Sequence, residues 1–421
     1  MRIPIYSSIF IVIIGLVITN IAGAAPVDST GSLGGPPIRV LLCRRLDRCR
    51  NITAQAISIS ASNSHKNAVL SEQGQSDPNA GYRITVNGSR VQVSSATGMQ
   101  SKSYSRFKLP NQTGAVWLIA GGSEPARAYR GSLSFTVKNG YLRIINVLPL
   151  EDYLRGVLPP EIGPDAPIEA LKAQAVVSRT FALMSMMTSQ NRDYDVTDTT
   201  ASQIYNGFSA ENARTDGAIQ DTAGLVLHHN GKLFLAEYGA DCGGVTAGGD
   251  SPSDYPPSVM DSAGPGQPDY CANGRYHSWT LTMAPAQISR LLDAYPRTRV
   301  GDLKQITVLQ ADVSGRAAQI QLSGSEASPV VTGVQLRSAL GYSVLKSTLF
   351  TVQQDQNGNF IFDGRGYGAG AGLCQDGAIG MAGPPYRFNY QQILEHYFPN
   401  SEIVSDANSP SLSPTQTSEA P

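Results

Sequence analysis

Apolar and polar residues alternate along the first third of the chain. Between residues 38 and 147, short alternating runs are separated by turn residues. A period of two is typical of strands with one buried face. Asn87-Gly88 and Asn139-Gly140 interrupt two of these runs, and Asn-Gly is favoured in two-residue hairpin turns. The pattern predicts a β-rich N-terminal part over residues 38–147.

A different pattern follows and predicts one long helix over residues 165–190. The segment is rich in alanine and leucine, which favour helices. Asp165 is placed to cap its first turn, and Pro167 falls in that turn, where proline is tolerated. Glu161 precedes this helix and follows Pro159 and Pro160, so we expect it on a loop.

The remaining chain mixes short helices and strands. Alternation around Asn230-Gly231 predicts a hairpin over residues 224–236. Residues 364–383 are rich in glycine, which lets a backbone approach a ligand closely. The other expected elements are helices over 209–222, 284–295 and 390–397, and two strands within 302–322. Together these patterns predict a β-rich α+β fold with one long central helix.

Both ends of the chain differ from its body in composition. Met1-Arg2, a mostly apolar stretch and Ala22-Gly-Ala24 are typical of a secretory signal peptide over residues 1–24. An uncleaved membrane anchor is the alternative, although the apolar stretch is short for one. Residues 25–37 predict a linker, and residues 404–421, rich in Ser, Pro and Thr, predict a disordered tail. We expect an exported protein that touches a membrane only if its N-terminus stays uncleaved.

The net charge of the 421 residues is −1, and the sequence has no basic run. Both features argue against nucleic acid as a partner. There are five cysteines. Cys43 and Cys49 are close enough in sequence to form a local disulfide, which suits an exported protein.

Two adjacent segments resemble the core motif of the SpoIID/LytB family. Residues 170–183 depart only conservatively from the family's ALKAQAVAARTYAL, and residues 148–162 precede them. Further motifs occur in the family's order. They are Tyr129-Arg-Gly131, Gln203 to Gly207, Tyr238 to Thr246, Gly364 to Ala378 and Tyr390 to Tyr397. The chain is identified as a member of the family over residues 38–403, with its catalytic region over residues 148–403.

The resemblance implies a reaction, because sporulation members of the family are peptidoglycan lytic transglycosylases. Glu161 is then the catalytic acid. It would protonate the glycosidic oxygen between MurNAc and GlcNAc, and its carboxylate would then help the sugar's C6 hydroxyl attack C1 to form a 1,6-anhydro end. Ordinary glycosidases use two carboxylates instead. The apolar neighbours Leu158 and Ile162 would help keep Glu161 protonated.

The resemblance also implies a glycan groove around Glu161. Gln174 and Arg179 would position Glu161 or sugar hydroxyls, and glycines would let the glycan approach the backbone. The full set of expected glycan contacts is Gln174, Arg179, Tyr205, Tyr238, Gly243, Gly244, Tyr367 and Gln375. Family members prefer glycan stripped of its stem peptides, so a cell-wall amidase is an expected partner.

Two departures from the family pattern leave another function open. The histidine of the family's glycine-rich loop falls on Ala369, and a histidine near its GGxT motif falls on Gly239. Neither residue can bind a metal or transfer a proton. The alternative is a glycan-binding modulator of an amidase, without catalysis of its own.

The other three cysteines carry two interpretations. Cys242, Cys271, Cys374 and His277 would form a tetrahedral zinc site, and some family members bind zinc near the groove. A Cys242–Cys271 disulfide with Cys374 free is the competing interpretation, favoured by the oxidising compartment. A zinc centre with an open position would also suit an exported metal-dependent hydrolase.

Overall fold

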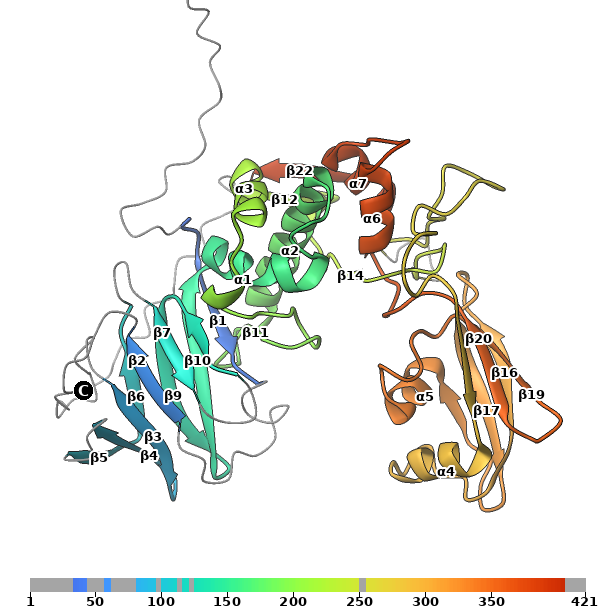
Figure 1. The fold of residues 1–421 in the computed structure, drawn as a ribbon, viewed down its shortest axis with the longest axis horizontal. Coiled ribbons are helices and arrows are strands. Elements are labelled where there is room, and N and C mark those ends of the chain that lie inside the picture. Colours follow the sequence, from blue (N-terminus) through green and yellow to red (C-terminus); the bar gives the residue numbers. More distant parts are fainter. Residues whose placement is uncertain are drawn as a thin grey trace, which may run out of the picture.

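The computed structural model describes residues 33–43, 57–61, 81–95, 100–111, 116–120, 125–249 and 255–405. Strands and helices combine in a β-rich α+β fold, as the sequence predicts. In Figure 1 the N-terminal strands lie on one side, the strands of residues 279–364 on the other, and helices α1, α2, α6 and α7 between them.

The N-terminal part consists of two sheets that share one core. Their strand orders are β11-β1-β10-β9-β6 and β5-β4-β3-β2-β7-β8. Aromatic and branched residues fill the space between them, with the rings of Tyr82 and Phe107 5.5 Å apart. The strands are β1 (Pro37–Leu41), β2 (Ile57–Ala61), β3 (Tyr82–Asn87), β4 (Arg90–Ser95), β5 (Ser101–Tyr104), β6 (Arg106–Leu109), β7 (Trp117–Ala120), β8 (Arg127–Tyr129), β9 (Ser132–Lys138), β10 (Tyr141–Pro149) and β11 (Val196–Thr197).

Both predicted N-terminal hairpins are confirmed. β3 pairs with β4 around Gly88, and β9 pairs with β10 around Asn139-Gly140. Asn139 and Gly140 have φ angles of 54° and 80°. A turn with two positive φ angles matches the right-handed twist of the strands, which is why Asn-Gly occurs there.

The prediction that Glu161 lies on a loop is wrong. Helix α1 (Leu150–Ile162) continues through Pro159 and Pro160 and contains Glu161 in its last turn. Pro160 cannot donate to the carbonyl oxygen of Gly156, four residues earlier. The backbone N–H of Asn206 donates to that oxygen instead, at 3.0 Å. A distant segment therefore supplies the hydrogen bond that Pro160 cannot make within the helix.

The long helix is α2 (Ile168–Thr188), slightly shorter than predicted. Its N-cap is Pro167, without a capping side chain, so the predicted cap by Asp165 is wrong. Ala175, Ala182 and Leu183 pack into the N-terminal core, whereas Ala170 and Ala173 pack into the core formed with α6 and α7. Alanines on both sides let two cores approach this helix closely.

The elements after α2 correct three further predictions. The helix expected over residues 209–222 is α3 (Ala213–Asp221), capped by Asn212. The glycine-rich segment is a loop only to Gly372, because β21 (Leu373–Cys374) and α6 (Gln375–Ala382) follow. The expected tail begins later, because β22 (Ser401–Ser405) pairs with β12 (Leu225–His229). The hairpin of β12 with β13 (Lys232–Leu233) and helix α7 (Tyr390–Tyr397) are confirmed.

Residues 279–364, here called the second β region, have a hydrophobic core of their own. The predicted helix and the predicted pair of strands lie in this region as α4, β16 and β17. Its elements are β15 (Trp279–Met283), α4 (Pro285–Asp293), β16 (Leu303–Ala311), β17 (Ala317–Gly324), β18 (Val330–Thr332), α5 (Gly333–Leu340), β19 (Phe350–Gln354) and β20 (Phe360–Gly364).

Several predictions concern residues outside the described ranges. They are the signal peptide over 1–24, most of the linker, Cys49, and the tail beyond Ser405. Cys43 is disulfide-bonded. Among the described residues, no helix combines the length and hydropathy needed to span a membrane.

Candidate functional site

Glu161 lies where the end of α1 meets the segment that follows β11. Its carboxylate oxygen Oε1 accepts a hydrogen bond from the backbone N–H of Ile204 at 2.5 Å. Ile204 is two residues from Asn206, which bonds to Gly156 of the same helix. The segment that completes the proline-containing helix thus also fixes the carboxyl group. The side chain is half-buried.

A chain of uncharged polar side chains lies beside Glu161. We call it the amide network; its members are Tyr153, Gln174, Ser178, Gln203, Tyr238 and Gln375. The hydroxyl of Tyr153 donates to Gln203 Oε1 at 3.1 Å, and Gln203 Nε2 donates to the hydroxyl of Tyr238 at 3.1 Å. Burial raises the pKa of both tyrosines, and the charge of Glu161 raises it further. Both hydroxyls therefore remain protonated next to the candidate acid.

The network continues through α2 to α6. Gln174 Nε2 donates to Ser178 Oγ at 2.9 Å, and Gln375 Nε2 donates to Gln174 Oε1 at 3.3 Å. Gln174 and Gln203 are fully buried and Gln375 nearly so. Satisfied polar networks of this kind fix side-chain positions, because a broken link leaves a buried group unpaired. The structure thus places three predicted residues, Gln174, Tyr238 and Gln375, in one array.

Two predicted glycan contacts are buried and engaged elsewhere. Arg179 is 1% exposed and donates to both carboxylate oxygens of Glu151, at 2.6 and 2.8 Å. Tyr205 is also 1% exposed, and its hydroxyl donates to Asn146 at 2.9 Å. Side chains buried to this degree cannot contact a polysaccharide. In this structure Arg179 and Tyr205 thus take part in internal packing and hydrogen bonding.

The predicted glycines make room for side chains of the protein itself. A Cβ atom on Gly243 would overlap Arg365, and one on Gly244 would overlap Asp269. Tyr367 is half-buried, forms a backbone bridge with Asp241 and packs edge-on against Tyr276. The space that these glycines leave is occupied, so close approach of a glycan is not what requires them.

Three cysteines distant in sequence come together at the end of the amide network. We call Cys242, Asp261, Cys271 and Cys374 the thiol cluster; their ligand atoms all lie within 4.8 Å of one another. Cys374 directly precedes Gln375. The sulfur atoms of Cys242 and Cys271 are 3.9 Å apart and all three thiols are free, so the disulfide interpretation is wrong for this structure.

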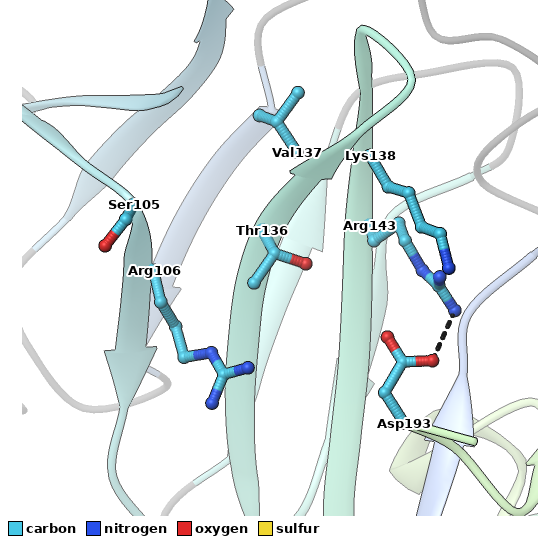
Figure 2. Close-up of a pocket in the computed structure, with 7 residues that line it drawn as sticks. All are labelled: Ser105, Arg106, Thr136, Val137, Lys138, Arg143 and Asp193. Atoms are coloured by element: carbon cyan, nitrogen blue, oxygen red, sulfur yellow. Dashed lines mark hydrogen bonds and ion pairs between the residues drawn. The ribbon is translucent and has the colours of Figure 1, made fainter. Parts of the chain in front are cut away.

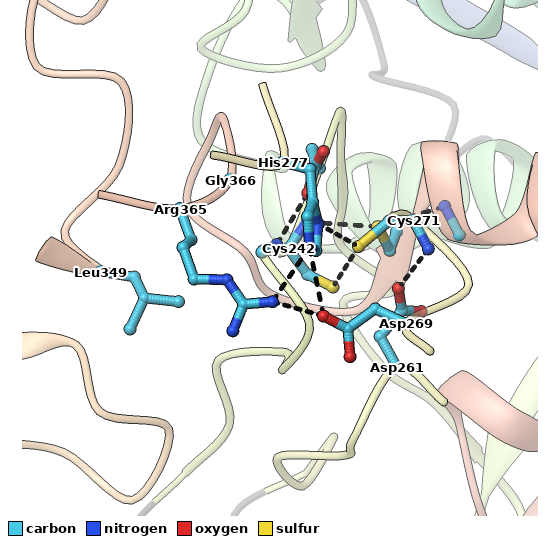
Figure 3. A network of polar contacts seen from close by, with 12 residues as sticks. Cys242, Asp261, Asp269, Cys271, His277, Leu349, Arg365 and Gly366 are labelled. Atoms are coloured by element: carbon cyan, nitrogen blue, oxygen red, sulfur yellow. Dashed lines mark hydrogen bonds and ion pairs between the residues drawn. The ribbon is translucent and has the colours of Figure 1, made fainter. Parts of the chain in front are cut away.

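His277 lies beside the thiol cluster rather than within it. Its Nδ1 atom is 3.3 Å from the sulfur of Cys271, and its Nε2 atom is 3.2 Å from Asp269 Oδ2. In Figure 3 the ring lies between Cys271 and the guanidinium of Arg365. Asp241, Cys271 and His277 form a second group of close ligand atoms.

Burial among other acids perturbs the ionisation of the thiol cluster. Hydrogen bonds from Cys271 and Cys374 lower the pKa of Cys242 to about 6, which favours a thiolate there. Burial raises the pKa of Asp261 to about 8. Burial, aided by the charge of Asp241, raises the pKa of Asp376 to about 6. The Cys242 thiol thus ionises more readily than an exposed thiol, whereas Asp261 and Asp376 keep their protons to a higher pH than exposed aspartates do.

The donor set fits a divalent metal ion with a preference for sulfur. Three cysteines and one carboxylate make a tetrahedral set of the kind that binds zinc. The backbone N–H groups of Cys242 and Gly377 donate to the sulfur of Cys374, at 3.2 and 3.4 Å, as they would to a thiolate. Asp261 completes this group of close ligand atoms, whereas the predicted ligand His277 is grouped with Cys271 and Asp241.

A separate pocket of about 530 Å³ lies on the N-terminal part (Figure 2). Arg106 and Lys138 line it, together with Arg143, which donates to Asp193 at 2.9 Å. Its remaining lining residues are Ser105, Thr136 and Val137. None of the residues predicted for catalysis or glycan binding lines this pocket.

Comparisons with known proteins agree with the motifs. Residues 138–229 match the family model described as Stage II sporulation protein, and residues 268–372 match a domain of unknown function, DUF8618. An uncharacterised protein of Brachyspira hyodysenteriae (strain ATCC 49526 / WA1) is 33% identical over 280 residues, which span 66% of this chain and 72% of that protein.

Two relatives have functional names. The amidase enhancer of Bacillus subtilis (strain 168) is 28% identical over 300 residues, 60% of this chain but only 40% of that protein. Stage II sporulation protein D of Bacillus amyloliquefaciens is 26% identical over 282 residues, 62% of this chain and 76% of that protein. Both names and the matching model point the same way as the motifs around Glu161. The chain belongs to the SpoIID/LytB family.

Proposed function

We propose that this protein is an exported lytic transglycosylase that cleaves peptidoglycan glycan strands with Glu161 as its acid and base. Membership of a cell-wall family supports peptidoglycan as the substrate. The position of Glu161 in the structure supports its assignment as the catalytic residue. Its carboxyl group is half-buried, held by the N–H of Ile204, and bordered by the protonated hydroxyls of the amide network.

The proposed reaction needs only this one carboxyl group. Glu161 donates its proton to the glycosidic oxygen as the bond between MurNAc C1 and that oxygen breaks. The resulting carboxylate accepts the proton of the C6 hydroxyl, whose oxygen bonds to C1. The proton count on Glu161 is restored, and no water is consumed. Ordinary glycosidases use a second carboxylate for the step that the substrate's own hydroxyl performs here.

The amide network supports this chemistry indirectly. Its links hold Gln203 and Tyr238 in place, and uncharged neighbours do not stabilise the ionised form of an acid as a cation would. We infer that Tyr238 and Tyr367, both half-buried, contact the sugar rings of the glycan. Gln174 and Gln375 are positioning residues in this scheme, because they are buried.

The decisive experiment analyses products by mass spectrometry. Residues 25–421, the expected exported chain, and its Glu161→Gln variant are incubated with peptidoglycan from which an amidase has removed the stem peptides. We expect 1,6-anhydroMurNAc ends from the parent protein and at least about 100-fold less from the variant, since general acid–base catalysis contributes about 10²–10⁴-fold. Glu395→Gln, at an exposed position of α7, is the matched control.

Other products would contradict the proposal. Reducing ends would indicate a hydrolase. Equal activity of the Glu161→Gln variant and the parent would remove Glu161 from the mechanism.

A second function is favoured by one relative. The Bacillus subtilis protein is named amidase enhancer, and this chain has Gly239 and Ala369 where the family has histidines. A non-catalytic protein of this kind would bind the glycan and raise the rate of a cell-wall amidase. Glycan binding without cleavage by either protein, together with faster stem-peptide release by an added amidase, would establish it.

A further inference from the structure

The thiol cluster and its neighbours contain more metal-binding atoms than one ion can use. Cys242, Asp261, Cys271 and Cys374 form one group of close ligand atoms, and Asp241, Cys271 and His277 form another. Cys271 belongs to both groups. A thiolate sulfur has enough lone pairs to bind two metal ions at once, so the two groups can be occupied together.

His277 has the arrangement expected of a metal ligand. A histidine that binds a metal through one ring nitrogen usually donates the N–H of the other to a carboxylate. Here Nε2 is 3.2 Å from Asp269 Oδ2, while Nδ1 faces the sulfur of Cys271 at 3.3 Å. Arg365 donates to the same carboxylate and holds it in place. Arg365 Nη2 also lies 3.0 Å from Nε2, so the guanidinium and the carboxylate together fix the ring with Nδ1 facing Cys271.

Asp241 supplies the second observation. Its side chain is buried, and Oδ1 accepts the N–H of Gly243 at 2.7 Å. Oδ2 is buried, and the carboxyl group of Asp376 forms a side-chain hydrogen bond with Asp241. Asp376 Oδ2 faces the same glycine, Gly274, so the neighbour is another carboxyl group. A buried carboxylate oxygen is costly unless a donor or a cation satisfies it.

The nearby arginines bond to groups other than Asp241. Arg365 is paired with Asp269. Arg316 donates to the backbone oxygens of Cys242 and Val245, at 2.7 and 3.0 Å.

We propose that this region binds two divalent metal ions that share the Cys271 thiolate. One ion is held by Cys242, Cys271, Cys374 and Asp261. The other is held by Asp241, Cys271 and His277, with Asp269 orienting the histidine. Each thiol loses its proton on binding, as thiolate ligation requires. Sulfur and imidazole donors select ions such as zinc. This second position does not depend on the glycan-cleaving activity of Glu161.

The test counts metal ions in the purified, reduced chain of residues 25–421. The protein is stripped with a chelator, titrated with Zn²⁺, and weighed by native mass spectrometry. We expect two ions per chain, and one in each of the variants His277→Gln and Asp241→Asn. His229→Gln and Asp363→Asn, which lie outside both groups, should retain two.

A second measurement avoids any dependence on the folding of variants. The unmodified chain is loaded with ¹¹³Cd²⁺ and examined by NMR. Two cadmium signals that split each other would indicate a shared sulfur ligand. A single bound ion in the parent protein, or two ions in both the His277 and Asp241 variants, would overturn the proposal. So would two cadmium signals without mutual splitting.

Discussion

The amide network and the thiol cluster are two buried polar regions joined at Cys374-Gln375, and they satisfy their polar atoms in opposite ways. The amide network combines donors and acceptors, so its amides and hydroxyls pair with one another. The thiol cluster and Asp241 are rich in acceptors, and Asp241 lies beside another carboxyl group, that of Asp376. A neutral network can be completed by protein alone, whereas an acidic cluster needs protons or metal ions from outside.

The largest expected effect comes from a third arrangement, a buried ion pair. Arg179 and Glu151 have side-chain exposures of 1% and 8%. Arg179→Met removes the cation and leaves a buried carboxylate, which should lower the free energy of unfolding by about 3–5 kcal/mol. Chemical denaturation measures this effect.

Arg143→Met is the control for that comparison. Arg143 pairs with Asp193, whose side chain is 46% exposed, and exposed pairs contribute about 0–1 kcal/mol. If both variants lose the same small amount, Arg179 is not a structural residue. The predicted role in positioning Glu161 would then need to be tested again.

Removing metal should have the next largest effect. A ligand present at 100 times its dissociation constant stabilises the folded state by about 2.7 kcal/mol. An excess of chelator should therefore lower the melting temperature of the zinc-loaded protein. The Cys374→Ser variant should respond much less, because one of its thiolate ligands is gone. An unchanged melting temperature of the parent protein would mean that the acidic groups of the thiol cluster are neutralised by protons and not by a metal ion.

Breaking the amide network should lower the stability of the protein by less than removing the metal does. Gln203→Met keeps the side-chain volume but removes the partners of Tyr153 and Tyr238, so each buried hydroxyl loses a hydrogen bond. We expect a loss of about 1–3 kcal/mol in the free energy of unfolding. Bound zinc should not change. A variant as stable as the parent would show that the hydrogen bonds of Gln203 to Tyr153 and Tyr238 do not stabilise the fold.

The smallest effect concerns pH. Burial lowers the pKa of His396 below its usual 6.5. Below pH 6.5 the unfolded chain therefore binds a proton that the folded protein still excludes, so stability falls as the pH falls through this range. Melting temperatures at about pH 7.5 and about pH 5.5 should differ less in the His396→Gln variant. An equal difference in both proteins would exclude His396 as the cause.

The sequence predicts elements whose ends are marked locally. Asn139-Gly140 identifies a hairpin, and α7 has the predicted bounds because Asn389 and Gln392 form a capping box. The sequence does not predict helix α1, because the donor to the carbonyl oxygen of Gly156, which Pro160 cannot supply, is the backbone N–H of Asn206. Local patterns cannot reveal a donor that arrives from a distant part of the chain.

The candidate site follows the same rule. The motif resemblance singles out Glu161, and the cysteines are visible as rare residues. Asp261 has no distinctive local context, and only folding brings it to Cys271. Arg179 looked functional because its partner, Glu151, lies 28 residues earlier in the chain. The identity of a residue was easier to predict than its neighbours.

The second β region enters and leaves the fold at one place. Its first and last residues, Trp279 and Gly364, are partners in the pairing of β15 with β20. Just outside them, Gly366 donates to the backbone oxygen of Tyr276 at 2.9 Å. Chain segments whose ends lie together are tolerated as insertions. The region therefore branches from the rest of the chain at one point, and Glu161, the amide network and all five cysteines lie outside it. Only side chains such as Arg316, which donates to the backbone oxygen of Cys242, reach back from it to the thiol cluster.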